Sequence, residues 1–141
     1  MANQKMGFEG ILYYGTAGST ASTQLTNCKD ITIGGDVERG DTTVRGSGST
    51  PPVKSSSVTS VALTIEFTML NDSTDASLEA LKVAAAAGTP VALRGKDYSS
   101  GKGPDADFNL SVSKPWPLNG EQVVTFTAEA DRGSREPTVY T

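Results

Sequence analysis

The stretch that decides the fold is SVTSVALTIEFTML, residues 57–70. Large apolar side chains fall on every second position, and the positions between them carry Ala, Thr and Glu. The apolar set is Val61, Leu63, Ile65, Phe67 and Met69. A period of two is typical of a β-strand with one face against a core and the other in water. We therefore predict a long strand in a half-buried antiparallel sheet.

Two later runs repeat this alternation. They cover residues 108–113 and 123–130, and they are joined by PWPLNG at 115–120. Because Asn-Gly is a strong turn signal and the prolines stiffen the connection, these runs predict a hairpin with a rigid tip. Shorter strands are predicted at 10–14, 30–34, 42–45 and 90–94.

One segment, 75–87, has the pattern of an α-helix. Gly88 and Pro90 follow it directly, as expected at a helix C-terminus. Its N-cap candidates are Asp72, Ser73 and Asp75, and its apolar stripe is expected at Leu78, Leu81 and Ala85.

These elements predict a mainly β fold: a small antiparallel β-sandwich or barrel with one α-helix packed against a sheet or an end. We expect a single domain over residues 1–141. A doubly wound parallel fold is disfavoured because it needs helices alternating with strands. Residues 46–57 and 96–107 are predicted to be loops, and 132–141 to be a C-terminal arm that orders on a partner.

The composition predicts a thin core and excludes several kinds of catalysis. Hydrophobic residues make up 36% of the chain, and histidine is absent. Without histidine the chain can build no Ser-His-Asp or Cys-His site and hardly any catalytic zinc site. We therefore expect no enzyme, no cofactor and no metal. Cys28 is expected to be a buried or idle thiol, and a thin core suggests that neighbouring subunits add stability.

Charge and hydropathy limit the partners. The net charge of −4 argues against an electrostatic grip on nucleic acid. No apolar run approaches about 18 residues, so we expect no membrane span. Residues 1–8 lack the apolar core of a signal peptide, which suggests folding in a reducing compartment.

Two candidate ligand motifs fail on spacing. Residues 95–103 resemble a phosphate loop, but five residues separate Gly95 from Gly101 where four are required, and Gly103 stands in the place of a Ser or Thr. The acidic residues within 30–41 lack the spacing of a calcium loop. No pair of carboxylates is singled out for hydrolytic chemistry, although two acids converging in a cleft would revive that interpretation.

The polar faces of the predicted strands carry small hydroxyl, amide and carboxylate groups and no Lys or Arg. They comprise Thr64, Glu66 and Thr68, Asn109, Ser111 and Ser113, and Thr125, Thr127 and Glu129. One interpretation is an ordinary solvent-facing sheet. The other is a wet, mildly negative wall that a polyanion passes without binding, because affinity for phosphates comes mainly from positive charge.

The order of elements resembles the major tail tube proteins of long-tailed bacteriophages, which are related in fold to the tube proteins of contractile injection systems. The resemblance covers nearly the whole chain and rests on element order more than on any one motif. Its segments are GILYYG (10–15), DITI (30–33), ERGDTTVR (38–45), the strand 57–70, the helix 75–87, PVAL (90–93) and LNGEQVVTFTA (118–128).

The resemblance implies protomers that close into six-membered rings, which stack into a hollow tube. Through its lumen double-stranded DNA leaves the capsid without specific binding. It implies a place in the virion tail, assembly in the host bacterial cytoplasm, and tape measure, tail tip and terminator proteins as partners. The loop that would reach the next ring is Arg45, Gly46, Ser47, Gly48, Ser49, Thr50, Pro51, Pro52, Val53 and Lys54. The lumen-facing set would be Thr64, Glu66, Thr68, Thr125, Thr127 and Glu129.

The alternative function is a ligand-binding β-sandwich of the carbohydrate-binding or adhesin type. It would stack a ligand on exposed, clustered aromatic side chains. The candidates are Tyr13, Tyr14, Tyr98 and Trp116, although Trp116 can equally anchor the hairpin tip to the core or to a neighbour.

Overall fold

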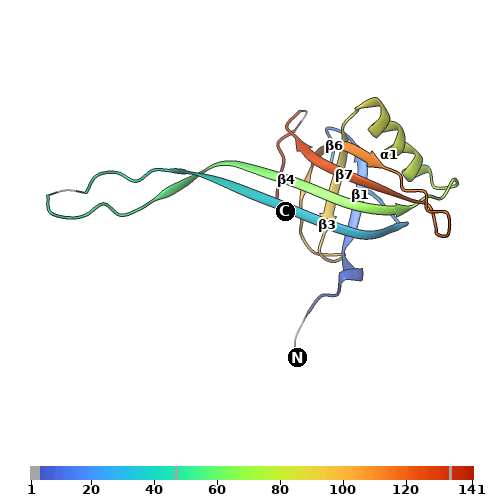
Figure 1. The fold of residues 1–141 in the computed structure, drawn as a ribbon, viewed down its shortest axis with the longest axis horizontal. Coiled ribbons are helices and arrows are strands. Elements are labelled where there is room, and N and C mark those ends of the chain that lie inside the picture. Colours follow the sequence, from blue (N-terminus) through green and yellow to red (C-terminus); the bar gives the residue numbers. More distant parts are fainter. Residues whose placement is uncertain (1–3, 47, 134) are drawn as a thin grey trace.

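The computed structural model describes residues 4–46, 48–133 and 135–141 (Figure 1). Within them lie a short 3-10 helix, seven strands and one α-helix. In chain order they are η1 (Gly7–Glu9), β1 (Ile11–Thr16), β2 (Thr23–Gln24), β3 (Cys28–Asp41), β4 (Ser56–Leu70), α1 (Ala76–Ala87), β5 (Val91–Lys96), β6 (Asp105–Ser113) and β7 (Val123–Asp131). None of the described helices is long and apolar enough to cross a membrane.

The strands form one antiparallel sheet in the order β2-β1-β5-β6-β7-β4-β3. The sheet curls on itself, so that its edge strand β3 returns toward β5. A Cβ on Gly95 of β5 would lie 2.8 Å from Ile33 Cδ1 of β3, although these strands are far apart in the sheet order. The predicted mainly β fold with one helix is therefore confirmed as a curled, barrel-like sheet.

The core fills the inside of the curl. Leu63, Ile65, Phe67 and Met69 are at most 4% exposed, as the alternation of β4 predicts. Phe67 stacks on Phe126 of β7 with ring centroids 5.1 Å apart. Further core side chains come from β1, β5, β6 and α1: Leu12, Leu93, Phe108, Leu78 and Leu81.

Helix α1 begins and ends where the sequence predicts. The Asp75 carboxylate accepts hydrogen bonds from the backbone N–H groups of Ser77 and Leu78, and Gly88 has the left-handed φ of +73° that favours glycine. The predicted stripe is correct at Leu78 and Leu81. Ala84 is its third buried residue, whereas Ala85 is only partly buried.

The largest correction concerns the hairpin of β3 and β4. The predicted strand 30–34 is the first half of the 14-residue β3, because Gly34 and Gly35 stay paired with Thr64 and Leu63 and do not end it. The predicted strand 42–45 is wrong: these residues lie beyond β3, in the connection 42–55. The predicted loop 46–57 overlaps this connection, and β4 already starts at Ser56. The two-residue β2 was not predicted.

Candidate functional site

The polar side chains singled out in the sequence lie in adjacent rows on one face of the sheet. Across β4 and β7, Thr64 faces Glu129, Glu66 faces Thr127 and Thr68 faces Thr125. On β6, the same rows continue with Asn109, Ser111 and Ser113. Thr68 and Thr125 are half-buried and the other residues of these rows are exposed. Strand alternation therefore identifies a continuous surface that points away from the core.

This polar face continues onto β3 and becomes more acidic there. Thr32, Gly34 and Asp36 pair with Glu66, Thr64 and Ala62. Next along the strand, the Ser60 hydroxyl donates to the Glu38 carboxylate at 3.1 Å. The carboxylates of these rows are Asp36, Glu38, Glu66 and Glu129, and none of the described residues that form these rows is Lys or Arg. Farther along the same face of β6 and β7, Asp107 pairs with Asp131, and Arg135 is ion-paired with Asp107. The rows themselves offer a polyanion no positive charge to bind.

The hairpin of β3 and β4 extends well beyond the body of the molecule (Figure 1). Leu63 is the last buried residue of its apolar side, at 4% exposed, and the next residue on that side, Val61, is 49% exposed. Val37, opposite Val61, is 47% exposed. Val37 and Val61 therefore form a half-exposed apolar pair outside the core, which leaves apolar surface for another molecule to cover.

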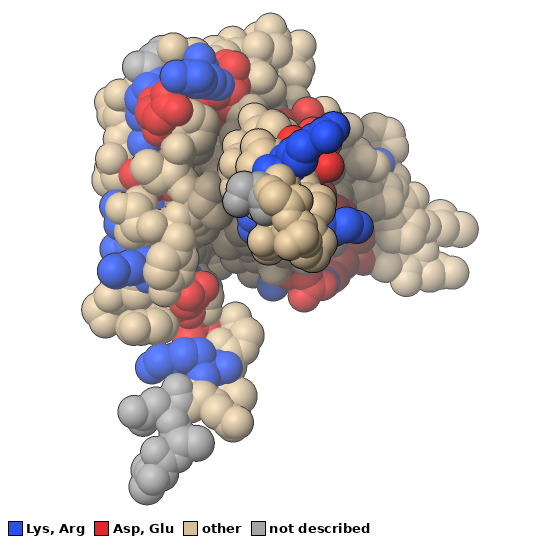
Figure 2. All heavy atoms as spheres, turned by 90° about the vertical axis from the view of Figure 1, so that its left-hand side faces the viewer, with Lys and Arg blue, Asp and Glu red and all other residues tan. Residues whose placement is uncertain are grey.

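Hydrogen bonds connect the two sides of the distal end of the hairpin, residues 42–55. Thr42 N–H donates to the Ser55 carbonyl at 3.0 Å, and Ser55 N–H donates to the Thr43 hydroxyl at 2.9 Å. Arg45 and Lys54 are its only charged residues. Figure 2 looks along the hairpin onto this end, where blue Lys or Arg atoms stand out from uncharged tan atoms. The predicted inter-ring residues lie here, except that Ser47 is outside the described residues.

The protruding hairpin gives the chain an unusually large surface. The accessible area is 9115 Å² for a mass of 14.6 kDa. A compact monomer of this mass exposes roughly 6900 Å². The excess, about 2200 Å² on that scale, is of the size that stable interfaces bury.

The described part of the C-terminal tail docks on its own chain. Arg135 Nη1 donates to Asp105 Oδ1 at 2.8 Å, and Arg135 Nε donates to Asp107 Oδ1 at 2.9 Å. Farther along, Thr138 pairs with Asp105, and Thr141 exchanges backbone hydrogen bonds with Gly103. The described tail is therefore ordered on its own chain, because the fold brings two carboxylates of β6 beside a tail that has no pattern of its own. Binding of this arm to a partner stays a prediction.

The same two carboxylates are the pair of converging acids that the hydrolytic interpretation requires. Asp105 and Asp107 lie close together, but Arg135 forms an ion pair with each of them. The Gly18 N–H also donates to the two carboxylate oxygens of Asp107, at 3.0 and 3.1 Å. Burial lowers the pKa of Arg135, but the hydrogen bonds and charges of both carboxylates outweigh it and raise this pKa above its ordinary value. The cluster is thus an ion-paired clasp that holds the tail.

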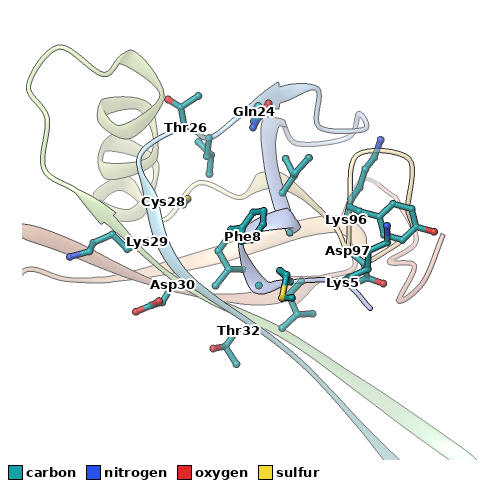
Figure 3. Close-up of a pocket in the computed structure, with 18 residues that line it drawn as sticks. Lys5, Phe8, Gln24, Thr26, Cys28, Lys29, Asp30, Thr32, Lys96 and Asp97 are labelled. Carbon is teal, nitrogen blue, oxygen red and sulfur yellow. The ribbon is translucent and has the colours of Figure 1, made fainter. Parts of the chain in front are cut away.

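An open groove of about 1350 Å³ runs between the N-terminal segment and strands β1, β3 and β5 (Figure 3). Lys5 lies over the Tyr98 ring at 4.4 Å, and Lys96 over the Tyr13 ring at 5.3 Å. Cys28 also lines it, and burial, followed by the charge of Asp75, raises the pKa of its thiol to about 12. The thiol is therefore protonated at neutral pH and is not a nucleophile, as expected for an idle cysteine.

The aromatic candidates do not form one platform. Tyr13 is in register with Arg94, which pairs with Asp105 at the start of β6. Trp116, which is 69% exposed, lies just beyond the C-terminal end of β6. It is therefore not an anchor to the core, and nothing in this arrangement favours the ligand-binding alternative.

Comparison with known proteins finds likeness in structure only. No protein-family profile matches the chain, and no curated protein matches its sequence. Three of the solved structures that match each cover nearly all of this chain. A chain in the tail of an empty gene transfer agent (GTA) particle with C6 symmetry has a TM-score of 0.73 at 13% identity, covering 96% of this chain and 98% of that one.

A chain of the virion of a native GTA particle has a TM-score of 0.69 at 11% identity, covering 98% of this chain and 99% of that one. A chain of the SPP1 tail tube has a TM-score of 0.65 at 14% identity, covering 98% of this chain and 79% of that one. The protein therefore has the fold of these GTA and SPP1 chains, two of which are tail chains, and the resemblance drawn from its sequence is confirmed at the level of the fold.

Proposed function

We propose that this protein is the structural protomer of a tail tube. Six copies close into a ring, and the rings stack into a hollow tube through which double-stranded DNA leaves the capsid. The observation that carries the proposal is the likeness, over nearly the whole chain, to a tail of C6 symmetry and to the SPP1 tail tube.

The acidic polar face supports a role as the wall of the lumen. Its rows across β3, β4, β7 and β6 present hydroxyls and the carboxylates of Glu66 and Glu129. Tight binding of DNA phosphates needs Lys or Arg, so a duplex slides past such a wall without being held. In the tube, Thr64, Thr68, Thr125 and Thr127 line the lumen beside these two glutamates.

The long hairpin supports ring stacking. It leaves the body with its apolar side uncovered and ends in residues 45–54, which reach the adjacent ring. A contact between different surfaces of identical copies repeats along an axis, and this is what a tube requires.

The remaining parts of the proposal follow from the same role. The protein is not an enzyme and holds no cofactor or metal. It lies in the virion tail after assembly in the host bacterial cytoplasm, where its partners are the tape measure, tail tip and terminator proteins.

Electron microscopy of the purified protein tests the proposal. We expect hollow tubes or sixfold rings at high protein concentration. A species that stays monomeric at every concentration, and in the presence of its tail tip proteins, contradicts it.

A further inference from the structure

The distal end of the hairpin and the opposite end of the molecule have complementary surfaces. The distal end is residues 42–55. We name the opposite end the acceptor pole, and define it as the β6–β7 connection, residues 114–122, with the adjoining residues 71–75 before α1. Both parts of the acceptor pole lie at the far end of the molecule from the hairpin tip (Figure 1).

The two parts of the acceptor pole are joined by hydrogen bonds. Asn71 N–H donates to the Gln122 carbonyl at 3.1 Å, and the Asn71 side-chain amide donates to the Gln122 side chain at 2.6 Å. Lys82 of α1 donates to the Asn71 side chain at 2.8 Å. The acceptor pole is therefore one braced surface and not two independent loops.

Both surfaces carry apolar side chains that are largely exposed. On the acceptor pole, Trp116 is 69% exposed and Leu118 is 96% exposed. On the distal end of the hairpin, Val44 and Val53 are 77% and 82% exposed. Aromatic and aliphatic residues of this kind dominate the energetics of interfaces when another protein covers them.

Their net charges are opposite in sign, because the acceptor pole holds the three acids Asp72, Asp75 and Glu121 and one base, Lys114. The distal end carries Arg45 and Lys54 and no acid. On the acceptor pole, Asp72 is fully exposed, and hydrogen bonds from Thr74 lower the pKa of its carboxyl, so that it is ionised at neutral pH. Lys29 already neutralises the other exposed acid, Glu121. Asp72 therefore remains available to a basic partner.

We propose that the distal end of the hairpin docks on the acceptor pole of a second copy of this chain, with Val44 and Val53 against Trp116 and Leu118 and with Arg45 or Lys54 beside Asp72. This rests on the proposed function and identifies the surface that receives the hairpin. Residues 36–41 alone carry the tip about 20 Å beyond the body, so contact with another copy needs no rearrangement of the fold. Because the two surfaces lie at opposite ends, every docked copy leaves a free hairpin for the next one.

Cysteine cross-linking of assembled tubes tests the contact directly. In a Cys28→Ala background, the double variant Val44→Cys, Leu118→Cys is oxidised after assembly, and we expect a ladder of covalent multimers on a non-reducing gel. The matched control pairs Val44→Cys with Val83→Cys, which is 67% exposed on α1 and outside the acceptor pole. We expect no ladder from it.

A charge-reversal series gives a second readout. Asp72→Lys and the double variant Arg45→Glu, Lys54→Glu should each lower the amount of tube that pellets by about tenfold, and combining them should restore it. The control Arg132→Glu changes the charge by as much as Asp72→Lys does, at a residue 77% exposed outside both surfaces, and should have no effect.

Three outcomes separate the two proposals. A ladder from the acceptor-pole pair alone, with rescue by combined reversal, supports the contact. Normal tubes with no such ladder, or with the ladder only in the control, overturn the contact and leave the tube function standing. Failure of the unaltered protein to form rings or tubes contradicts the tube function, and the contact with it.

Discussion

At the scale of single residues, the fold depends most on the stacked pair Phe67 and Phe126. Both rings are fully buried, and they join β4 to β7 at the centre of the curl. Truncating Phe67→Ala removes the stack and leaves a cavity, so we expect the free energy of unfolding to fall by about 3–5 kcal/mol. Urea denaturation measures this free energy of unfolding. Val58→Ala, at a half-exposed residue, is the control and should change it little. Equal effects of the two changes would contradict this account of the core.

Arg135 holds the tail against the body by a nearly buried ion pair. Its side chain is 18% exposed and that of Asp107 is 2% exposed. Arg135→Ala leaves two carboxylates without their cation, so we expect a loss of about 3–5 kcal/mol. Arg132→Ala breaks an ion pair with Glu136 whose two side chains are 77% and 68% exposed. This change should lower the free energy of unfolding by less than about 1 kcal/mol. Chemical denaturation measures the free energy of unfolding of both variants. Similar losses would contradict the larger contribution assigned to the ion pairs of Arg135.

Cys28 gives a prediction on pH. Its folded pKa of about 12 exceeds the ordinary value of 9.0, so the folded protein keeps a proton that the unfolded chain releases. The stability from this group is complete below pH 9 and is lost as the pH rises toward 12. Unfolding at pH 8 and pH 11 measures the fall. Cys28→Ala should reduce the pH dependence, and an identical dependence in both proteins would contradict the assignment.

At the scale of elements, the hairpin of β3 and β4 serves two purposes at once. Its inner half supplies the core residues Leu63 and Phe67, and its outer half carries half-exposed valines and the basic tip. If the outer half makes the ring contacts proposed above, stability and assembly are separable along one element, because burial by the core ends between Leu63 and Val61.

Deleting residues 46–52 should accordingly leave the protomer folded and abolish polymerisation. The described residues of this segment, 46 and 48–52, lie beyond the strands and outside the core. We expect an unchanged circular dichroism spectrum, a melting temperature within a few degrees of the original and no tubes in the pellet. Replacing 46–52 by a Gly/Ser segment of equal length distinguishes the sequence of the tip from its length. Long tubes from the deletion would exclude the tip from ring stacking.

Elements differed in how well the sequence predicted them. Helix α1 was predictable from Asp75 to Gly88 because its caps and its stripe are local. The long hairpin was not, because Gly34 and Gly35 are turn signals by themselves and only their pairing with β4 keeps them in a strand.

At the scale of the whole molecule, the polar face of the sheet and the excess of exposed surface both support the proposed tube. A protomer that exposes about 2200 Å² more than a compact monomer has surface for partners to bury. The curled sheet places the acidic face opposite the core, so that one side is apolar and buried and the other is smooth and negative.

Glu66→Lys together with Glu129→Lys tests whether this face lines the lumen. Both side chains are exposed, so the variant should fold normally and assemble. Four units of added positive charge per protomer should hold the DNA and lower infectivity in a phage or particle carrying this tube. The control, Glu79→Lys with Glu136→Lys, changes the charge equally at exposed residues away from the polar face. Equal infectivity of the two variants would place the polar face elsewhere than the lumen.

The sequence by itself determined the alternation of 57–70, the capped helix and the two faces of each strand, because these depend on neighbours close along the chain. It also excluded histidine chemistry outright. Only the tertiary structure decided that the hairpin extends beyond the body, that Arg135 pairs with Asp105 and Asp107, and that Trp116 is exposed. Each of these depends on where distant segments meet when the sheet curls, and side-chain pattern along one strand carries no information about the strand that will lie across from it.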